Sequence, residues 1–343
     1  MKLFLGLDVS KDSFTAALAH EHTEPRQWRR LPAATFALSP EGIEELLAFI
    51  ASHEGEAQQA SSSSVACLCA EATGIYSLRL HELLRQHAPH LPHLSIINPA
   101  WAKGTARSLG LREKTDREDA RMLAMHALLH RPQPTVPRAP EHDALRELFA
   151  LREVLQEEIT ATENRLSSVR TAPARKHLSL LLGQVEKRLE AVDREIDACL
   201  LRAPALKHDF DLLLTVAGIG RITALAILST FGDLRSWSRQ QIVAYAGLHP
   251  RSHQSGTSVN VRPRLIKGGA ALLRKKLYMA AVAFVRRGPG KLSHQLLQQR
   301  GKAKMCSIGA HMRKLLLIAR AVVISATPYD AERLERQQAT LHT

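Results

Sequence analysis

The sequence predicts an α/β domain at the start of the chain, followed by a mainly helical region. Before residue 131, short apolar segments alternate with amphipathic ones, which is typical of strands and helices that share one sheet. After residue 140, leucine and isoleucine recur at helical spacing over long stretches. Residues 131–140 contain four prolines and predict the boundary between these two parts.

The α/β domain is expected to begin with three strands, at residues 2–9, 13–19 and 34–38. Ser39 and Pro40 then predict a helix that ends near residue 50, because serine caps a helix and proline fits its first turn. The elements that follow alternate: a strand at 64–69, a helix at 76–86, a strand at 94–97 and a helix at 114–130. This order predicts a mixed sheet.

Residues 144–202 predict two long helices separated by a kink near Pro173. Apolar residues at helical spacing alternate here with Glu, Arg and Gln, so the pair is expected to form an antiparallel hairpin or coiled coil. A spacer or dimerisation arm is the expected role of such a segment. Two further helices are predicted at 270–286 and 302–325.

Residues 212–227 resemble a helix-hairpin-helix element. An apolar helix is expected to end at Gly218 and Gly220, and Arg221 begins a second helix. Glycines in such a turn let backbone N–H groups approach a phosphate at the helix N-terminus. An ordinary helix–helix turn with a glycine cap fits the same residues equally well.

The composition excludes several classes of protein. No apolar run reaches the roughly 18 residues of a membrane span, and the N-terminus reaches charge too early for a signal peptide. The four cysteines form no disulfide framework and no metal-ligand spacing, which fits a reducing cytoplasm; Cys67 and Cys69 are expected to pack inside a strand. An aromatic content of 4% argues against a protein that binds single-stranded bases mainly by stacking.

Positive charge is concentrated in one segment of the chain. The 96 residues from 234 to 329 contain 18 Lys or Arg and no Asp or Glu, whereas the whole chain carries +14. Solvated surfaces normally mix both signs. This basic window, residues 234–329, therefore predicts a face that binds the backbone of a nucleic acid.

Ser255 lies in the basic window, between Gln254 and Gly256. A serine that attacks a phosphodiester needs cations to bind the phosphate and to stabilise the developing charge. The candidate cations near it in sequence are Arg251, Arg262, Arg264, Lys267, Arg274 and Lys275. His249 and His253 are candidate proton acceptors, and an ordinary turn is the alternative explanation for a serine beside a glycine.

A second group of candidate residues is acidic. Asp8 lies at the end of the first predicted strand and Glu71 at the end of a later one, while Asp116 and Asp119 are three residues apart on a predicted helix and so share one face. Carboxylates that converge repel one another unless cations neutralise them, and oxygen ligands suit Mg²⁺ or Mn²⁺. Two such ions about 4 Å apart stabilise the attacking and leaving oxygens of a phosphate. Helix or turn capping is the alternative role of each acid, and Glu118 is expected to be solvated.

An aspartate on the first strand of a β-β-β-α-β-α-β-α order matches the plan of RNase H-like nucleases. The motifs together resemble the DEDD-type insertion-sequence transposases, which are relatives of the pilin-gene invertases. The segments that carry the resemblance are Gly6–Lys11, Glu71 with Thr73 and Gly74, Lys114–Ala120, Ala246–Pro250, Gln254–Gly256, Lys267–Gly268 and Leu273–Arg274.

This resemblance spans nearly the whole chain and implies three domains. A RuvC-like domain of the RNase H-like class is expected at 1–135, a coiled-coil arm at 141–202 and a mainly helical C-terminal transposase domain at 208–328. By matching position, Asp8, Glu71, Asp116 and Asp119 would bind metal. Ser255 would be the nucleophile that forms a transient phosphoserine link to DNA.

The resemblance also implies partners. Members of the family act on double-stranded donor and target DNA, are guided by a structured bridge RNA, and assemble as homo-oligomers, dimers or tetramers, with shared active sites. A bacterial cytoplasmic protein that joins the nucleoid when active is therefore expected, with no membrane contact.

Three other functions stay open from the residues alone. A RuvC-like junction endonuclease would use the carboxylates and no serine, and a DNA invertase would use the same chemistry on inverted sites. A helix-hairpin-helix protein with a decayed nuclease fold would bind DNA without cutting it.

Overall fold

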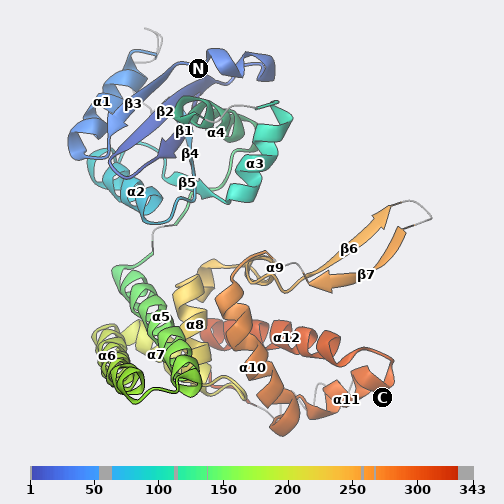
Figure 1. Cartoon of the computed structure of the whole chain (residues 1–343). Coiled ribbons are helices and arrows are strands. Elements are labelled where there is room, and N and C mark those ends of the chain that lie inside the picture. The colour runs from blue at the N-terminus through green and yellow to red at the C-terminus, as the bar shows by residue number, and fades with distance from the viewer. Residues whose placement is uncertain are drawn as a thin grey trace. The chain divides into compact units, whose positions relative to one another are not determined.

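The computed structural model describes residues 2–53, 64–111, 115–136, 138–255, 259–265 and 268–330. The chain divides into two compact units, Met1–Pro137 and Arg138–Thr343. Each unit has its own arrangement of elements (Figure 1). In the described ranges, no helix has the length and apolarity needed to cross a membrane.

Unit 1, Met1–Pro137, is built on a five-stranded mixed sheet. Its strands are β1 (Leu3–Val9), β2 (Ser13–His20), β3 (Ala33–Ala37), β4 (Val65–Glu71) and β5 (Leu94–Ile97), in the order β3-β2-β1-β4-β5. The pairs β1–β2 and β2–β3 are antiparallel, whereas β1–β4 and β4–β5 are parallel. The five predicted strands and their mixed directions are confirmed, and the arrangement is consistent with an RNase H-like domain.

Helices cover both faces of this sheet (Figure 1). On one face, α1 (Pro40–Ala51) and α2 (Ile75–His87) pack against the odd-numbered side chains of β1, such as Leu5 and Leu7. On the other face, α3 (Pro99–Ser108) and α4 (Asp116–His130) pack against Phe4, Cys67 and Cys69. The expected packing role of both cysteines is confirmed, because both are buried.

One helix of this unit was not predicted. No helix was predicted between the strand at 94–97 and the helix at 114–130, but Asn98 and Pro99 begin α3: the Asn98 side chain accepts a hydrogen bond from the Ala100 N–H at 2.8 Å. Asparagine at the cap and proline at the first position are a helix start signal. The end of a strand and the start of a helix therefore share the same two residues.

Gly6 is the position at which α4 contacts the sheet most closely. A Cβ atom added to Gly6 would lie 2.1 Å from the carbonyl oxygen of Ala120 and 2.1 Å from the backbone nitrogen of Ala124. Any side chain at this position would push the helix away from β1. The glycine therefore sets how deeply α4 lies on the sheet.

Unit 2, Arg138–Thr343, is mainly helical. Its helices are α5 (Pro140–Ser168), α6 (Ala172–Arg202), α7 (Pro204–Leu214), α8 (Arg221–Phe231), α9 (Arg239–Tyr245), α10 (Ala271–Arg287), α11 (Lys291–Gln299) and α12 (Lys304–Ser325). The helices α5 and α6 pack along each other as the predicted pair. The helical conformation is interrupted between them, just before Pro173. Leu145 of α5 and Ile196 of α6 belong to the same core as α7–α12, so the arm is part of this unit. Its status as a separate domain stays a prediction.

A two-stranded hairpin interrupts the helices of unit 2. The strands β6 (Pro250–Ser255) and β7 (Val259–Leu265) pair antiparallel, and Figure 1 shows them extending away from the helices of this unit. No strand was predicted here. Polar residues and Pro263 hide the alternation by which a strand is normally recognised.

Replacing Gly6 with Ala is expected to lower the free energy of unfolding by about 3 kcal/mol, because overpacking displaces α4. Gly104, on an exposed turn of α3, has nothing within 4 Å of an added Cβ, so Gly104→Ala is expected to raise stability by about 0.5–1 kcal/mol. Thermal unfolding followed by circular dichroism measures both. A midpoint for Gly6→Ala equal to that of the parent would contradict the close packing of α4.

Candidate functional site

Asp8 and Glu71 lie side by side at the carboxyl ends of two parallel strands. Leu7 pairs with Ala70 in the β1–β4 register, so the next residues along each strand are Asp8 and Glu71. Gly6 on β1 and Cys69 on β4 both face α4. Asp8 comes two residues after Gly6, and Glu71 comes two residues after Cys69. Since side chains two residues apart in a strand share a face, both carboxylates belong to the α4 face of the sheet.

The direction of α4 brings its first turn toward the same end of the sheet. At the carboxyl end of α4, the Arg131 guanidinium lies 5.5 Å from the ring centre of Phe4, near the start of β1. Earlier in the helix, Ala120 and Ala124 contact Gly6. The helix therefore runs against β1, and its first turn, which contains Asp116 and Asp119, extends toward Asp8.

Thr115 caps this helix, so neither Asp116 nor Asp119 is its cap. Its hydroxyl oxygen accepts a hydrogen bond from the Glu118 N–H at 3.2 Å. The alternative in which Asp116 or Asp119 is the cap is therefore not what the structure shows. Carboxylates in a first turn are also stabilised by the positive end of the helix dipole.

The four carboxylates are gathered at one end of unit 1 but are not assembled into a metal site. Asp116 is exposed, whereas Asp8, Glu71 and Asp119 are half-buried. In the part of the chain that the structure describes, no three His, Cys, Asp or Glu side chains form a group that could hold a metal ion.

Two buried oxygen atoms near the carboxylate end of unit 1 have no described hydrogen-bond partner, and a bound polar or cationic group would satisfy them. Glu118 was expected to be solvated, but this is wrong for its Oε2 atom, which is buried and has no hydrogen-bond partner among the described residues. The same holds for Oγ1 of Thr73, two residues after Glu71. Leaving a buried polar atom unpaired costs roughly 1–3 kcal/mol, so such atoms are uncommon unless a bound group satisfies them. The oxygen-rich set fits a hard divalent cation.

Ser255 is the last residue of β6, at the tip of the hairpin. It pairs with Val259 across the two strands, and Arg251 pairs with Arg264 nearer the base. The strand β7 also contains Arg262. The structure describes the backbone of these residues, so the contacts predicted for their side chains stay predictions; Lys267 lies outside the described residues. Of the two histidines, His249 precedes β6, and its Nδ1 atom is buried without a described partner.

Arg274 connects the two segments of the chain that flank the hairpin at its base. Its guanidinium donates hydrogen bonds to the carbonyl oxygens of Ala246 at 3.1 Å and Gly268 at 2.6 Å, on either side of β6 and β7. The backbone N–H of Ala270 adds a hydrogen bond to the Tyr245 carbonyl at 3.1 Å. In this structure Arg274, a predicted nucleic-acid contact, fixes the point from which the hairpin extends.

Gly218 and Gly220 differ in their surroundings. Gly218 has a φ of +88°, and a Cβ there would lie 2.8 Å from the Ala280 carbonyl oxygen of α10. Its identity therefore follows from backbone conformation and from packing. Gly220 is the exposed N-cap of α8 and has nothing within 4 Å of an added Cβ, so it alone leaves room for a backbone phosphate.

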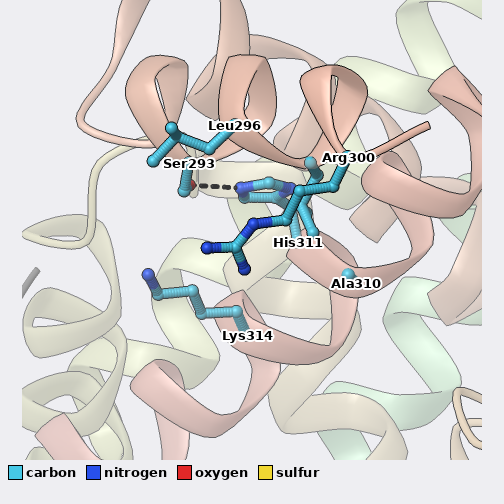
Figure 2. Close-up of a pocket in the computed structure, with 7 residues that line it drawn as sticks. Ser293, Leu296, Arg300, Ala310, His311 and Lys314 are labelled. Carbon is cyan, nitrogen blue, oxygen red and sulfur yellow. Dashed lines mark hydrogen bonds between the residues drawn. The ribbon is translucent and has the colours of Figure 1, made fainter. Parts of the chain in front are cut away.

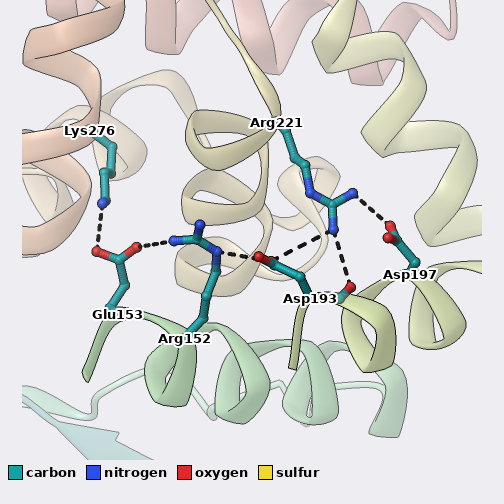
Figure 3. A network of polar contacts seen from close by, with 6 residues as sticks. All are labelled: Arg152, Glu153, Asp193, Asp197, Arg221 and Lys276. Atoms are coloured by element: carbon teal, nitrogen blue, oxygen red, sulfur yellow. Dashed lines mark hydrogen bonds and ion pairs between the residues drawn. The ribbon is translucent and has the colours of Figure 1, made fainter. Parts of the chain in front are cut away.

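The basic residues beside this turn are held by acids of the arm, as Figure 3 shows. Arg221 forms an ion pair with Asp197 of α6 at 2.6 Å, and Lys276 of α10 pairs with Glu153 of α5 at 2.6 Å. Arg152 connects the two sides through hydrogen bonds to Glu153 at 3.2 Å and to Asp193 at 3.0 Å. We call this set, Arg152, Glu153, Asp193, Asp197, Arg221 and Lys276, the arm network. Outside it, Lys275 lies 3.7 Å from Glu157.

Comparison with known proteins identifies the family. A model of the IS110-type DEDD transposase matches residues 5–171, and one described as the transposase IS116/IS110/IS902 family matches residues 210–296. A pilin gene-inverting protein of Moraxella bovis is 30% identical over 332 residues, which cover 96% of this chain and 98% of that protein. The chain belongs to the IS110 family of transposases. It is thus an enzyme that cleaves and rejoins DNA.

Other relatives support this assignment. The pilin gene-inverting protein of Moraxella lacunata is also 30% identical over 332 residues. The transposase for insertion sequence element IS1111A of Coxiella burnetii is 28% identical over 132 residues, or 36% of this chain and 33% of its own length. In this transposase the four carboxylates fall within the first family match and Ser255 within the second.

The arm network predicts a difference between two glutamates of α5. Glu153 is 6% exposed, and Glu153→Gln leaves Lys276 without its acidic partner, so the variant is expected to cost about 3–5 kcal/mol of stability. Glu157 forms an exposed pair, and Glu157→Gln is expected to cost less than about 1 kcal/mol. Urea unfolding of both variants measures the difference. Equal midpoints would show that the buried ion pairs contribute nothing specific.

Proposed function

We propose that this transposase exchanges DNA strands through a phosphoserine intermediate formed by Ser255, with the four carboxylates of a RuvC-like unit 1 acting on the same phosphate. The observation that supports it best is the placement of Ser255 at the tip of a hairpin whose strands carry three arginines and no acid. A nucleophile in such a position meets a backbone phosphate among cations.

The proposed reaction conserves bonds. The Ser255 oxygen attacks the phosphorus of a phosphodiester, the bond from phosphorus to one sugar oxygen breaks, and the serine proton ends on that sugar oxygen. A sugar hydroxyl of a second strand then attacks the phosphoserine, and its proton returns to the serine. One phosphodiester replaces another, so no external energy source is needed.

Asp8, Glu71, Asp116 and Asp119 would hold the metal. Bound Mg²⁺ or Mn²⁺ would supply Lewis acid stabilisation of charge on the phosphate oxygens. The residues themselves fit this task because Asp8 and Glu71 are register neighbours and the first turn of α4 extends toward them. Glu118 is a further carboxylate in the first turn of α4.

The partners proposed are donor and target duplex DNA and a structured bridge RNA, bound by a homo-oligomer, a dimer or tetramer, in the bacterial cytoplasm. The support is the family resemblance together with the basic window, which favours contacts to phosphate backbones over base reading. The low aromatic content fits the same proposal, in which the protein contacts phosphate backbones and the RNA selects the DNA sequence.

Inversion of a DNA segment is the second candidate outcome. The relatives that match almost the full chain are named pilin gene-inverting proteins. Inversion and transposition share the strand exchange described above and differ in how the sites are arranged. Plasmids that carry the two ends in inverted orientation or on separate molecules distinguish these products.

Replacing Ser255 with Ala is expected to abolish both strand exchange and the covalent protein–DNA adduct, because the attacking oxygen is lost. Ser252→Ala removes a second hydroxyl from the same strand and is expected to retain at least half of the activity. Denaturing gels of protein with labelled DNA detect the adduct. An adduct that persists in Ser255→Ala would favour the alternative endonuclease or another nucleophile.

Replacing Asp8 with Asn is expected to lower strand cleavage by at least 100-fold, because a ligand to the metal is lost. Asp12→Asn, at the exposed turn after β1, is the matched control and is expected to leave activity unchanged. Cleavage with and without Mg²⁺ or EDTA tests the same point. Full activity of Asp8→Asn in EDTA would mean that the carboxylates take no part in the chemistry.

A further inference from the structure

A pocket of about 260 Å³ lies between α11 and α12, and none of its lining residues belongs to the hairpin that carries Ser255. It is lined by Ser293, Leu296, Leu297, Arg300, Ala310, His311 and Lys314. Figure 2 shows the charged ends of Arg300 and Lys314 extending to the same side of the pocket, next to the Ser293–His311 pair. The volume is several times the roughly 30 Å³ that one water occupies, so it accommodates a small polyatomic anion.

A buried hydrogen-bonded chain forms the floor of this pocket. His311 is 2% exposed; its Nδ1 lies 2.7 Å from the Ser307 carbonyl oxygen and its Nε2 lies 2.8 Å from Ser293 Oγ. Because a carbonyl only accepts, Nδ1 carries a proton, and in the neutral ring Nε2 accepts from the serine. Ser293 Oγ also lies 3.0 Å from the Gly290 carbonyl, which offers its proton a second acceptor.

The pocket has positive charge and no counter-charge. Arg300 and Lys314 form no ion pair or side-chain hydrogen bond among the described residues, and the surrounding sequence from 234 to 329 contains no acid. Burial lowers the pKa of Lys314, and burial together with nearby Lys314 and His294 lowers the pKa of His311. These groups would all gain from a bound anion.

We propose that this pocket binds one phosphate group of the nucleic-acid backbone, at a contact separate from the strand that is cut. Arg300 and Lys314 hold the charge of the phosphate. Ser293 and His311 hold its oxygens at the floor of the pocket. The site anchors the nucleic acid against α11 and α12 and leaves the hairpin free for the reacting phosphate.

Binding of the anion reverses the direction of the hydrogen bond between Ser293 and His311 on the floor of the pocket. When His311 takes up a proton, its Nε2–H donates to Ser293 Oγ, and the serine hydroxyl is then able to donate to the phosphate. The other groups around His311 are Lys314 on α12, Arg300 in the pocket lining, His294 on α11 with ring centres 6.0 Å apart, and the apolar ring of Phe284 on α10 at 6.0 Å. Lys314 opposes protonation until an anion is present.

The first test measures inorganic phosphate binding to the full chain by ³¹P nuclear magnetic resonance. The double variant Arg300→Gln with Lys314→Gln is expected to lose at least tenfold in affinity. Arg313→Gln removes an exposed charge from the same helix outside the pocket and is the matched control. Equal losses in both proteins, or no phosphate binding by the parent, would overturn the proposal.

The second test separates a backbone phosphate from a free one. Binding to a duplex DNA is measured over a range of salt, and the double variant is expected to lower the magnitude of the log–log slope by about 0.9, because one phosphate contact is lost. A phosphate affinity that falls while the DNA slope stays unchanged would show a site for free phosphate or a nucleotide, and would overturn the backbone assignment. Because binding and not strand cleavage is the readout, the result does not depend on whether Ser255 is the nucleophile, so failure of the serine chemistry is distinguishable.

The third test uses sulfate, whose charge is constant between pH 5.5 and 7.5. Its affinity is expected to rise as pH falls, because proton uptake by His311 favours the bound state. His294→Gln is the control for the other histidine and is expected to keep this trend. An affinity that does not change with pH would overturn the part assigned to Ser293 and His311.

Discussion

The contact between α4 and Gly6 determines the geometry of the acidic end of the transposase. With no side chain at this position, the backbone of Ala120–Ala124 lies directly on β1. Two consequences follow from that one contact. The first turn of α4 is held near the ends of β1 and β4, and the helix cannot slide outward without exposing Phe4 and Cys69. Gly6, which has no side chain, therefore determines where the carboxylates lie.

Charge is organised differently in unit 2. Acids of the arm helices form ion pairs with Lys275 and Lys276 of the basic window and with Arg221, which precedes the window. This neutralises the basic residues nearest the helical core. The hairpin carries its arginines beyond the arm network, and the pocket beside α12 keeps its two cations without a described ion-pair partner. Positive charge is thereby left at places where a phosphate is able to approach.

Sequence reasoning succeeded where a local pattern decides the structure. The strands of unit 1, the cap at Ser39 and the break before Pro173 all follow from residues adjacent in the chain. It could not find partners that lie far away in sequence. Charge alone does not reveal that Arg274 also binds backbone carbonyl groups or that Arg221 pairs with an aspartate of α6, so their predicted phosphate contacts stay predictions. The hairpin was missed because its strands lack apolar alternation, and the pocket because Ser293 and His311 form no recognisable motif.

The central claim is that the hydroxyl at the hairpin tip is the atom that joins protein to DNA. The most direct test digests the trapped protein–DNA adduct with nuclease and protease and locates the remaining nucleotide by mass spectrometry. The account predicts that the nucleotide is attached through phosphate to Ser255. Attachment to Ser293 or to another residue, or recovery of cleaved DNA with no attached peptide under conditions that retain phosphoserine, would contradict it.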